Sequence, residues 1–225
     1  MRALAVTATI LLSLWAPTPA HANPLCRWTG ICLYLSPGFK VTVVDAESGK
    51  PLSGVYGWAE WTQYGAHGRG GPLMVQDATS DAAGHLSFAH WGPTFGSAGG
   101  LLLGTDPAVI FFKPGYATLL VENGVPLGAS QHSAIRGFSH SGETLRLQPF
   151  RGSPAEWVEQ LRQLAHPALS SSISDTHLDT FRALYLRRLE LVEGQLRQMP
   201  VGSGDIAKFR SSLELDRRFL TGGRR

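Results

Sequence analysis

Histidine has the clearest capacity for chemistry in this chain, and five of its eight copies fall between residues 40 and 150. Imidazole nitrogens bind zinc and copper, so several histidines gathered at one end of a fold could hold a metal. The chain contains no His-Glu-x-x-His or His-x-His motif to support that arrangement. The sequence therefore favours scattered surface histidines and predicts no metal and no cofactor. The weak candidates for a metal site are His85, His90, His132 and His140.

The chain also contains the residue types of a Ser/His/Asp catalytic set, namely Ser139, His140, His85 and Asp81. No Gly-x-Ser-x-Gly elbow is present to place a nucleophile on a strained turn. We therefore predict no catalytic residue and expect a protein that is not an enzyme.

Aromatic side chains around one predicted strand are a stronger sign of binding. The segment 55–61 alternates, so that Trp61 points to one face of a strand and Trp58 to the other. Exposed aromatic rings on a sheet face can stack on sugars or contact peptides. The alternative is that the rings pack in the core and between sheets. The predicted binding surface consists of Tyr56, Trp58, Tyr64 and Trp91.

The first 22 residues have the features of a secretory signal peptide. Arg2 precedes an uncharged apolar stretch, and Ala20-His21-Ala22 forms an A-x-A cleavage site. The stretch is shorter than the roughly 20 residues needed to span a bilayer, so we expect no membrane span after cleavage. An uncleaved anchor is the alternative. The sequence indicates a periplasmic or secreted protein, which argues against a nucleic-acid partner.

The two cysteines, Cys26 and Cys32, lie just after the predicted cleavage site. In an oxidising compartment the simplest expectation is a short disulfide that holds the N-terminal segment, residues 23–39. A redox pair is less favoured, because the spacing does not form a Cys-x-x-Cys motif.

The stretch from residue 40 to 150 has short apolar runs separated by Gly, Pro, Asp and Ser. Three turn signatures stand out, within residues 45–55, 80–86 and 112–116. Turns at such intervals are typical of an antiparallel β-sandwich, here of about seven strands. We interpret the glycine-rich segment 65–72 as a loop.

These turn residues resemble the carboxypeptidase regulatory-like domain, a transthyretin-like (Ig-like) sandwich. The resemblance implies a module that is generally not catalytic. Relative to that family, residues 65–77, 91–106 and 124–142 are long insertions. The matching residues are Asp45, Gly49, Pro51, Leu52, Gly54 and Val55, then Ser80, Asp81 and Gly84, then Lys113, Pro114, Gly115 and Tyr116.

A related group, the transthyretin-like hydroxyisourate hydrolases, suggests an enzymatic alternative. Their C-terminal Tyr-Arg-Gly-Ser motif is similar to Phe150-Arg-Gly-Ser153. However, Thr42 or Val43 stands where those enzymes have a histidine. Ser153 and Glu156 also have the spacing of a helix capping box, which explains part of the match.

From residue 153 to 221 the spacing of apolar residues becomes helical. We expect a helix that opens at Ser153, a second over residues 176–199, and a third that begins at Asp205. The apolar stripe of the second helix either packs within the chain, which we favour, or joins two copies into a homodimer. Arginines in this tail alternate with acidic residues, which is typical of a solvated face.

The sequence thus predicts a mainly β protein with an α tail, in four parts: 1–22, 23–39, 40–150 and 153–221. As its function we expect a binding or structural module of the cell envelope that contacts protein or glycan. The alternatives are a metal-dependent or hydroxyisourate-type hydrolase at the end of the sandwich, and a dimeric spacer joined by its helices.

Overall fold

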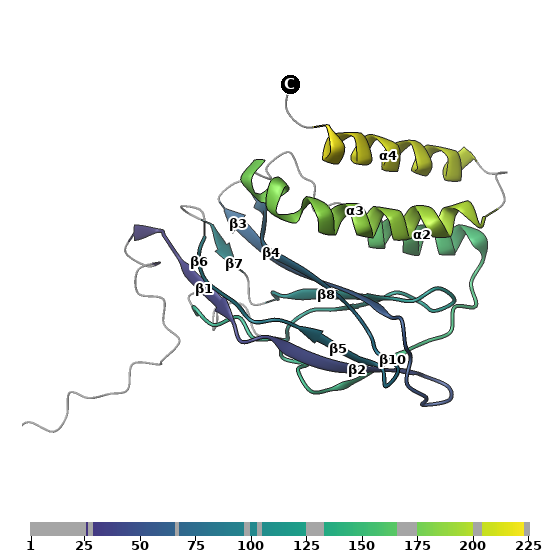
Figure 1. Ribbon diagram of the computed structural model, residues 1–225, viewed down its shortest axis with the longest axis horizontal. Coiled ribbons are helices and arrows are strands. Elements are labelled where there is room, and N and C mark those ends of the chain that lie inside the picture. The colour runs from purple at the N-terminus through teal and green to yellow at the C-terminus, as the bar shows by residue number, and fades with distance from the viewer. Residues whose placement is uncertain are drawn as a thin grey trace, which may run out of the picture.

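The computed structural model describes residue 26 and residues 29–65, 68–96, 100–102, 105–124, 133–165, 175–199 and 204–222. The side chains of residue 69 and residues 175–178 are not among those described. The predicted signal peptide and His132 lie outside these residues. Within them, β-sheets are followed by a helical tail, which confirms the predicted class (Figure 1).

The described part of the chain contains ten strands, where the sequence predicted about seven. The strands that the sequence did not predict lie in two of the segments that the resemblance treats as insertions, 65–77 and 91–106, and in the N-terminal segment 23–39. The strands are β1 (Leu33–Ser36), β2 (Phe39–Asp45), β3 (Tyr56–Gly65), β4 (Gly68–Thr79), β5 (His85–Phe88), β6 (Trp91–Phe95), β7 (Leu101–Leu102), β8 (Ala108–Phe112), β9 (Leu119–Val121) and β10 (Thr144–Leu147).

The strands form a larger and a smaller sheet that face each other. The larger sheet has the order β4-β3-β8-β9, with β7 also paired to β3. The smaller sheet has the order β10-β2-β5, and β1 and β6 form a separate pair. The expected antiparallel pattern holds except that β10 runs parallel to β2. Side chains between the sheets form one core, which includes Val43, Trp61, Leu86 and Phe111.

The glycine-rich segment 65–72 was expected to be a loop, and this expectation was wrong. Apart from residues 66 and 67, which are not described, it belongs to the hairpin of β3 and β4. The pairing shifts register between Trp61 and Thr62 and again between Gln63 and Tyr64. Such irregularities let a twisted hairpin continue through glycines, because the ladder supplies the backbone hydrogen bonds.

Three helices make up the tail: α2 (Pro154–Ala165), α3 (Asp175–Arg197) and α4 (Gly204–Thr221). The capping box at the start of α2 is confirmed. The backbone N–H of Ser153 donates to Glu156 Oε2 at 2.6 Å, and the N–H of Glu156 donates to Ser153 Oγ at 3.3 Å. None of the described helices has the length and apolar character needed to span a membrane.

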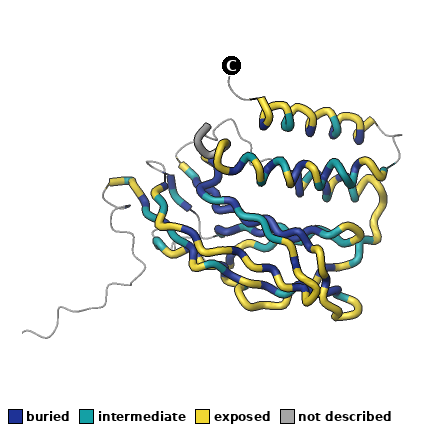
Figure 2. Tube along the Cα trace, viewed as in Figure 1, coloured by how far each residue is buried: buried dark blue, intermediate teal, exposed yellow. Residues whose placement is uncertain are grey.

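The helices add a third layer to the sandwich. α2 and α3 lie over the outer face of the larger sheet, and α4 lies on the side of α3 away from the sheet (Figure 1). The buried surfaces of the helices face inward and their exposed surfaces face out (Figure 2). A second core fills this interface and contains Tyr56, Trp58, Phe181, Tyr185 and Val192. The apolar stripe of α3 therefore packs within the chain, which is the alternative that the sequence analysis favoured over a homodimer.

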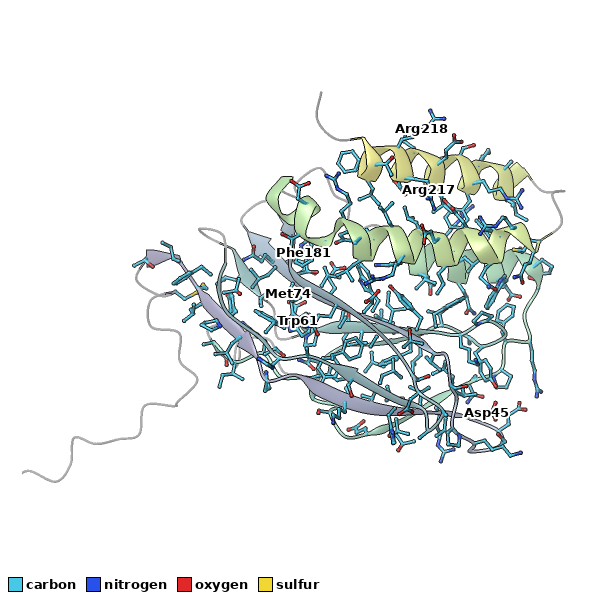
Figure 3. All side chains as sticks on the ribbon, viewed as in Figure 1. Asp45, Trp61, Met74, Phe181, Arg217 and Arg218 are labelled. Atoms are coloured by element: carbon cyan, nitrogen blue, oxygen red, sulfur yellow. A yellow bond between two sulfur atoms is a disulfide. The ribbon has the colours of Figure 1, made fainter. Side chains whose placement is uncertain are left out.

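Ion pairs join the outermost helix to this layer. Arg217 of α4 donates to both carboxylate oxygens of Glu193 on α3, at 3.0 and 2.8 Å. Figure 3 shows Arg217 between the two helices, with Arg218 on the outer side of α4.

Candidate functional site

The three turn signatures meet at one end of the sandwich, where their side chains bond to one another and to the backbone. The Tyr116 hydroxyl donates to Asp45 Oδ2 at 2.9 Å. Ser80 Oγ donates to the carbonyl of Leu52 at 2.7 Å and accepts from the N–H of Val55 at 2.8 Å. Figure 3 shows Asp45 at this end, away from the helical layer. We call Asp45, Ser80, Gly84, Lys113 and Tyr116 the turn cluster.

The acidic residues of these turns are held by backbone donors. The N–H groups of Ser48 and Glu47 donate to Asp45 Oδ1 at 2.6 and 3.0 Å, and the bond from Ser48 is the main reason that the pKa of Asp45 is lowered. The N–H groups of His85 and Ala83 likewise lower the pKa of Asp81. Carboxylates bound in this way stabilise turns.

Gly84 and Lys113 complete the turn cluster through close backbone contacts. Gly84 has φ +78°, and a Cβ built there would lie 2.4 Å from the carbonyl oxygen of Val43. Lys113 Nζ donates to the carbonyl of Ser53 at 2.7 Å. The residues that carry the family resemblance therefore hold the turns together.

The candidate histidines of the described residues do not gather. His85 Nδ1 lies 3.5 Å from Asp81, and His140 Nδ1 lies 2.8 Å from Glu143. His90 is exposed between β5 and β6. Across the described ranges, no three His, Cys, Asp or Glu side chains are placed to hold a metal ion together.

The predicted disulfide between Cys26 and Cys32 is present. The Arg151–Ser153 segment, which is similar to the hydrolase motif, has structural contacts. Arg151 pairs with Glu47, and Ser153 caps α2.

The prediction of an exposed aromatic surface was wrong. Tyr56 and Trp58 do point away from Trp61, but α3 covers them. The Trp58 ring lies 5.1 Å from the ring of Tyr185 and is 1% exposed. Trp91 packs edge-on against Trp61 in the inner core. The apolar stripe of the tail and the aromatic face of β3 are thus each other's partner.

Next to this aromatic contact the sheet and the helices leave a cavity of about 200 Å³. Its floor is the outer face of β3, β8 and β9, and its roof is formed by Gln163 of α2 and Arg188 of α3. Tyr64, the fourth aromatic residue of the predicted surface, lines it and is half-buried. We call this cavity the Glu60 pocket.

Two rows of side chains cross the floor of the Glu60 pocket. Trp58 pairs with Ile110, which pairs with Leu120. Two residues further along β3, Glu60 pairs with Ala108. The same register sets Ala108 opposite Glu122, which lies just after β9. An apolar row therefore lies beside a row in which a small residue separates two carboxylates.

The buried end of the acidic row is held by neighbouring side chains. The Thr62 hydroxyl donates to Glu60 Oε1 at 2.7 Å, and the Trp58 indole N–H donates to Glu60 Oε2 at 3.3 Å. The backbone N–H of Thr62 donates to Asp106 Oδ1 at 3.1 Å. Glu60 is 6% exposed. Its carboxylate is thus held in a fixed orientation at the wall of the pocket.

Arg188 joins the roof of the pocket to its floor. Its guanidinium carbon lies 4.4 Å from the centre of the Trp58 ring, and its Nε donates to the carbonyl of Leu164 at the end of α2. At 4% exposure it is buried. A cation–π contact and a charged hydrogen bond thus hold α2, α3 and β3 together beside the pocket.

A second contact, an ion pair, joins α3 of the helical layer to β4. Arg187 donates to the two oxygens of Asp77, both at 3.0 Å. Burial, with a further contribution from the charge of Asp77, raises the pKa of the Tyr56 hydroxyl beside this pair. Tyr56 therefore stays protonated at any physiological pH.

Sequence reasoning missed the pocket residues Glu60, Ala108, Glu122 and Arg188. Only the cross-strand register brings the first three together, and no motif marks that register in the sequence. No protein-family model and no curated protein matches this chain.

Proposed function

We propose that this protein is a non-enzymatic binding module of the cell envelope, secreted or periplasmic, whose ligand site is the Glu60 pocket. The pocket itself carries the proposal. Alternate residues of three strands line it, and buried polar groups converge on it in a fixed geometry. Concave sites with apolar walls and a few oriented polar groups are typical binding sites.

The predicted leader and the disulfide support the choice of compartment. The A-x-A site precedes Asn23, and Cys26 is bonded to Cys32 a few residues later. Disulfides persist mainly in oxidising compartments. We also propose that residues 40–150 are a carboxypeptidase regulatory-like sandwich, which the mutual bonding of the three turns supports.

The size of the pocket favours a protein partner over a glycan. About 200 Å³ is below the roughly 300–1,000 Å³ of sites that enclose drug-sized ligands. It suits a single side chain of a partner protein better than several sugar rings. The homodimer through residues 176–199 has less support, since Phe181, Tyr185 and Val192 already pack within the chain.

The proposal can be tested by NMR titration with small ligands of three classes: ammonium ions, carboxylates and neutral sugars. The Trp58 indole N–H reports on the pocket because it bonds to Glu60. We expect one class to shift this resonance saturably, and the ligand to be recovered unchanged. Conversion of a ligand that is lost in Glu60→Gln would show an enzyme instead. The absence of a Trp58 shift with all three classes would also contradict the proposal.

A further inference from the structure

We infer that one end of the sandwich, where β1 pairs with β6, rests on the surface of a lipid bilayer through an uncharged apolar face. This strand pair lies at the opposite end of the sandwich from the turn cluster (Figure 1 and Figure 3). The inference depends on the proposed location in the cell envelope and is separate from the Glu60 pocket. We call the surface formed by Leu33, Leu35, Phe95 and Ile135 the β1 face.

Strand pairing brings the four side chains of the β1 face to the same side. Along β1, Leu33 and Leu35 alternate with buried residues, so they point outward. Phe95 of β6 pairs with Leu33, and Ile135 forms a parallel bridge with Leu35. Phe95 is 62% exposed and Ile135 is 36% exposed. Apolar side chains from three separate segments therefore form one exposed patch, and such patches often mark interaction sites.

Buried polar groups hold the β1 face in place from behind. Arg136 donates to the carbonyl of Leu102 at 2.9 Å, and its guanidinium carbon lies 5.2 Å from the centre of the Tyr34 ring. The Tyr34 hydroxyl accepts from the backbone N–H of Leu102 at 3.2 Å. Arg136 is buried, and its charge is attracted to that of Asp106. The charge that follows Ile135 in the sequence is thus turned inward, away from the face.

The segments that contribute the β1 face carry no charged side chain. Residues 28–39, 91–105 and 123–135 include no Asp, Glu, Lys or Arg, although these four types make up 16% of the chain. Protein partners are usually recognised through hydrogen bonds and a polar rim around an apolar centre. A bilayer needs no specific polar contact, because its affinity for a surface follows the apolar area and the charge of that surface. The composition of this end therefore favours lipid over a protein partner.

The β1 face is also too small to hold two copies of the chain together. A stable interface buries roughly 800 Å² on each partner, from about 20–30 residues a side. The β1 face offers four apolar side chains, of which Phe95 alone is more than half exposed. Contact with the interfacial region of a bilayer has no such threshold, since affinity grows with the apolar area that leaves water.

The predicted leader brings the β1 face close to a membrane. Ten residues, 16–25, join the apolar stretch of the leader to Cys26. Cys26 is bonded to Cys32, which directly precedes Leu33. At about 3.5 Å for each extended residue, ten residues span at most roughly 35 Å. The β1 face is therefore the part of the fold that follows the leader, and it stays within reach of the bilayer for as long as the leader is attached.

The test is co-sedimentation of the mature protein with vesicles of phosphatidylcholine at millimolar lipid, and with vesicles that also contain phosphatidylglycerol. We expect the protein to bind the neutral vesicles, and a high salt concentration not to weaken this binding, because the β1 face carries no charge. Phe95→Ser should weaken the binding about tenfold. Phe219→Ser removes a similarly exposed ring from α4, 55% against 62%, and should leave the binding unchanged.

A second pair of variants locates the contact directly. Phe95→Trp keeps an aromatic ring on the β1 face and should bind at least as tightly as the unaltered protein, because indole rings favour the membrane interface. Vesicles of brominated phosphatidylcholine should quench the fluorescence of the added indole. Phe219→Trp is the matched control, and its added indole should not be quenched. Both positions are exposed, so these substitutions do not threaten folding.

The outcomes distinguish a bilayer from other partners. If the mature protein binds no vesicle, the inference fails. If it binds only vesicles with phosphatidylglycerol, is released by salt and is unaffected by Phe95→Ser, the arginines of the helical tail bind the lipid and the inference is wrong. If sedimentation without vesicles shows a dimer that Phe95→Ser dissociates, the β1 face joins two copies instead. None of these results bears on the Glu60 pocket, which the Trp58 resonance tests.

Discussion

The turn cluster and the Glu60 pocket both contain acidic and hydroxyl side chains, but these groups have different partners. In the turn cluster, Asp45 accepts from backbone N–H groups within three residues of it, and Ser80 bridges backbone groups of another turn. In the pocket, Glu60 is held by the side chains of Thr62 and Trp58 and faces a cavity. The first arrangement stabilises turns, and the second places a carboxylate at the wall of a cavity, where we propose that a ligand binds.

The family resemblance describes only the first of these two regions. Every residue of the turn cluster belongs to the signatures that carry the resemblance. The pocket depends on Ala108, Glu122 and the helical layer, which lie outside those signatures. The resemblance therefore informs the fold, and the function that we propose lies on the helix-covered face of the larger sheet, which the resemblance does not describe.

The largest effect should come from the interface beside the pocket. Trp58→Ala removes the contacts of the indole ring with Tyr185 and Arg188 in the second core. We expect it to lower the free energy of unfolding by about 3–5 kcal/mol. Urea unfolding measures this, with the exposed Phe219→Ala as a control that should change it by less than about 0.5 kcal/mol. A loss below about 1 kcal/mol would show that the helices are only loosely attached to the sheet.

A large effect is also expected in the turn cluster, from its backbone. Gly84→Ala imposes a Cβ on a residue with φ +78° and brings it to 2.4 Å from the carbonyl oxygen of Val43. We expect a loss of about 3 kcal/mol. Gly49 has φ +68° with no atom within 4 Å of a built Cβ, so Gly49→Ala should cost about 1 kcal/mol. Equal losses would mean that the close approach to Val43 does not matter.

A smaller loss of stability is expected when the buried hydroxyl of Ser80, which joins two of the turns, is removed. Ser80→Ala leaves the N–H of Val55 and the carbonyl of Leu52 without their partner, at a cost of about 2 kcal/mol in stability. The exposed Ser87→Ala on β5 is the control and should have little effect. If thermal unfolding shows the two variants to be equally stable, the Ser80 bridge does not hold the turns.

The smallest effect should appear only when pH is varied. The folded pKa of Asp45 is depressed, mainly by the N–H of Ser48, so this carboxylate stabilises the protein above its unfolded pKa of about 4. That stability is lost as the pH falls through the lower, folded pKa. The urea concentration at the midpoint of unfolding should therefore differ more between the unaltered protein and Asp45→Asn at neutral pH than in acid. A difference that does not change with pH would contradict this assignment.

The parts of the fold that were predictable are those with local signals. The capping box at Ser153 and the spacing of apolar residues located all three helices, and alternation placed Trp61 in the core. The strands β6 and β7 were missed because glycine and proline interrupt the pattern of β6, and the two residues of β7 are too few to show alternation. The parallel pairing of β10 with β2 joins residues about a hundred positions apart, and no local signal reports such a contact.

The candidate site was less predictable for the same reason. Alternation correctly separated Trp58 from Trp61, but it could not show that α3 covers Trp58. Glu60, Ala108 and Glu122 form a row only through the register of three strands. The sequence shows which residues could form such a row, and the pairing of the strands decides which of them do.

The most direct test of this account is the Trp58 indole N–H signal during titration with ammonium ions, carboxylates and neutral sugars, in the unaltered protein and in Ala108→Leu, which narrows the pocket. We predict that one class shifts this signal saturably in the unaltered protein and not in the variant, with unchanged signals from the turn cluster. Shifts confined to the turn cluster, or a Trp58 shift that persists in Ala108→Leu, would contradict the claim that the Glu60 pocket is the functional site.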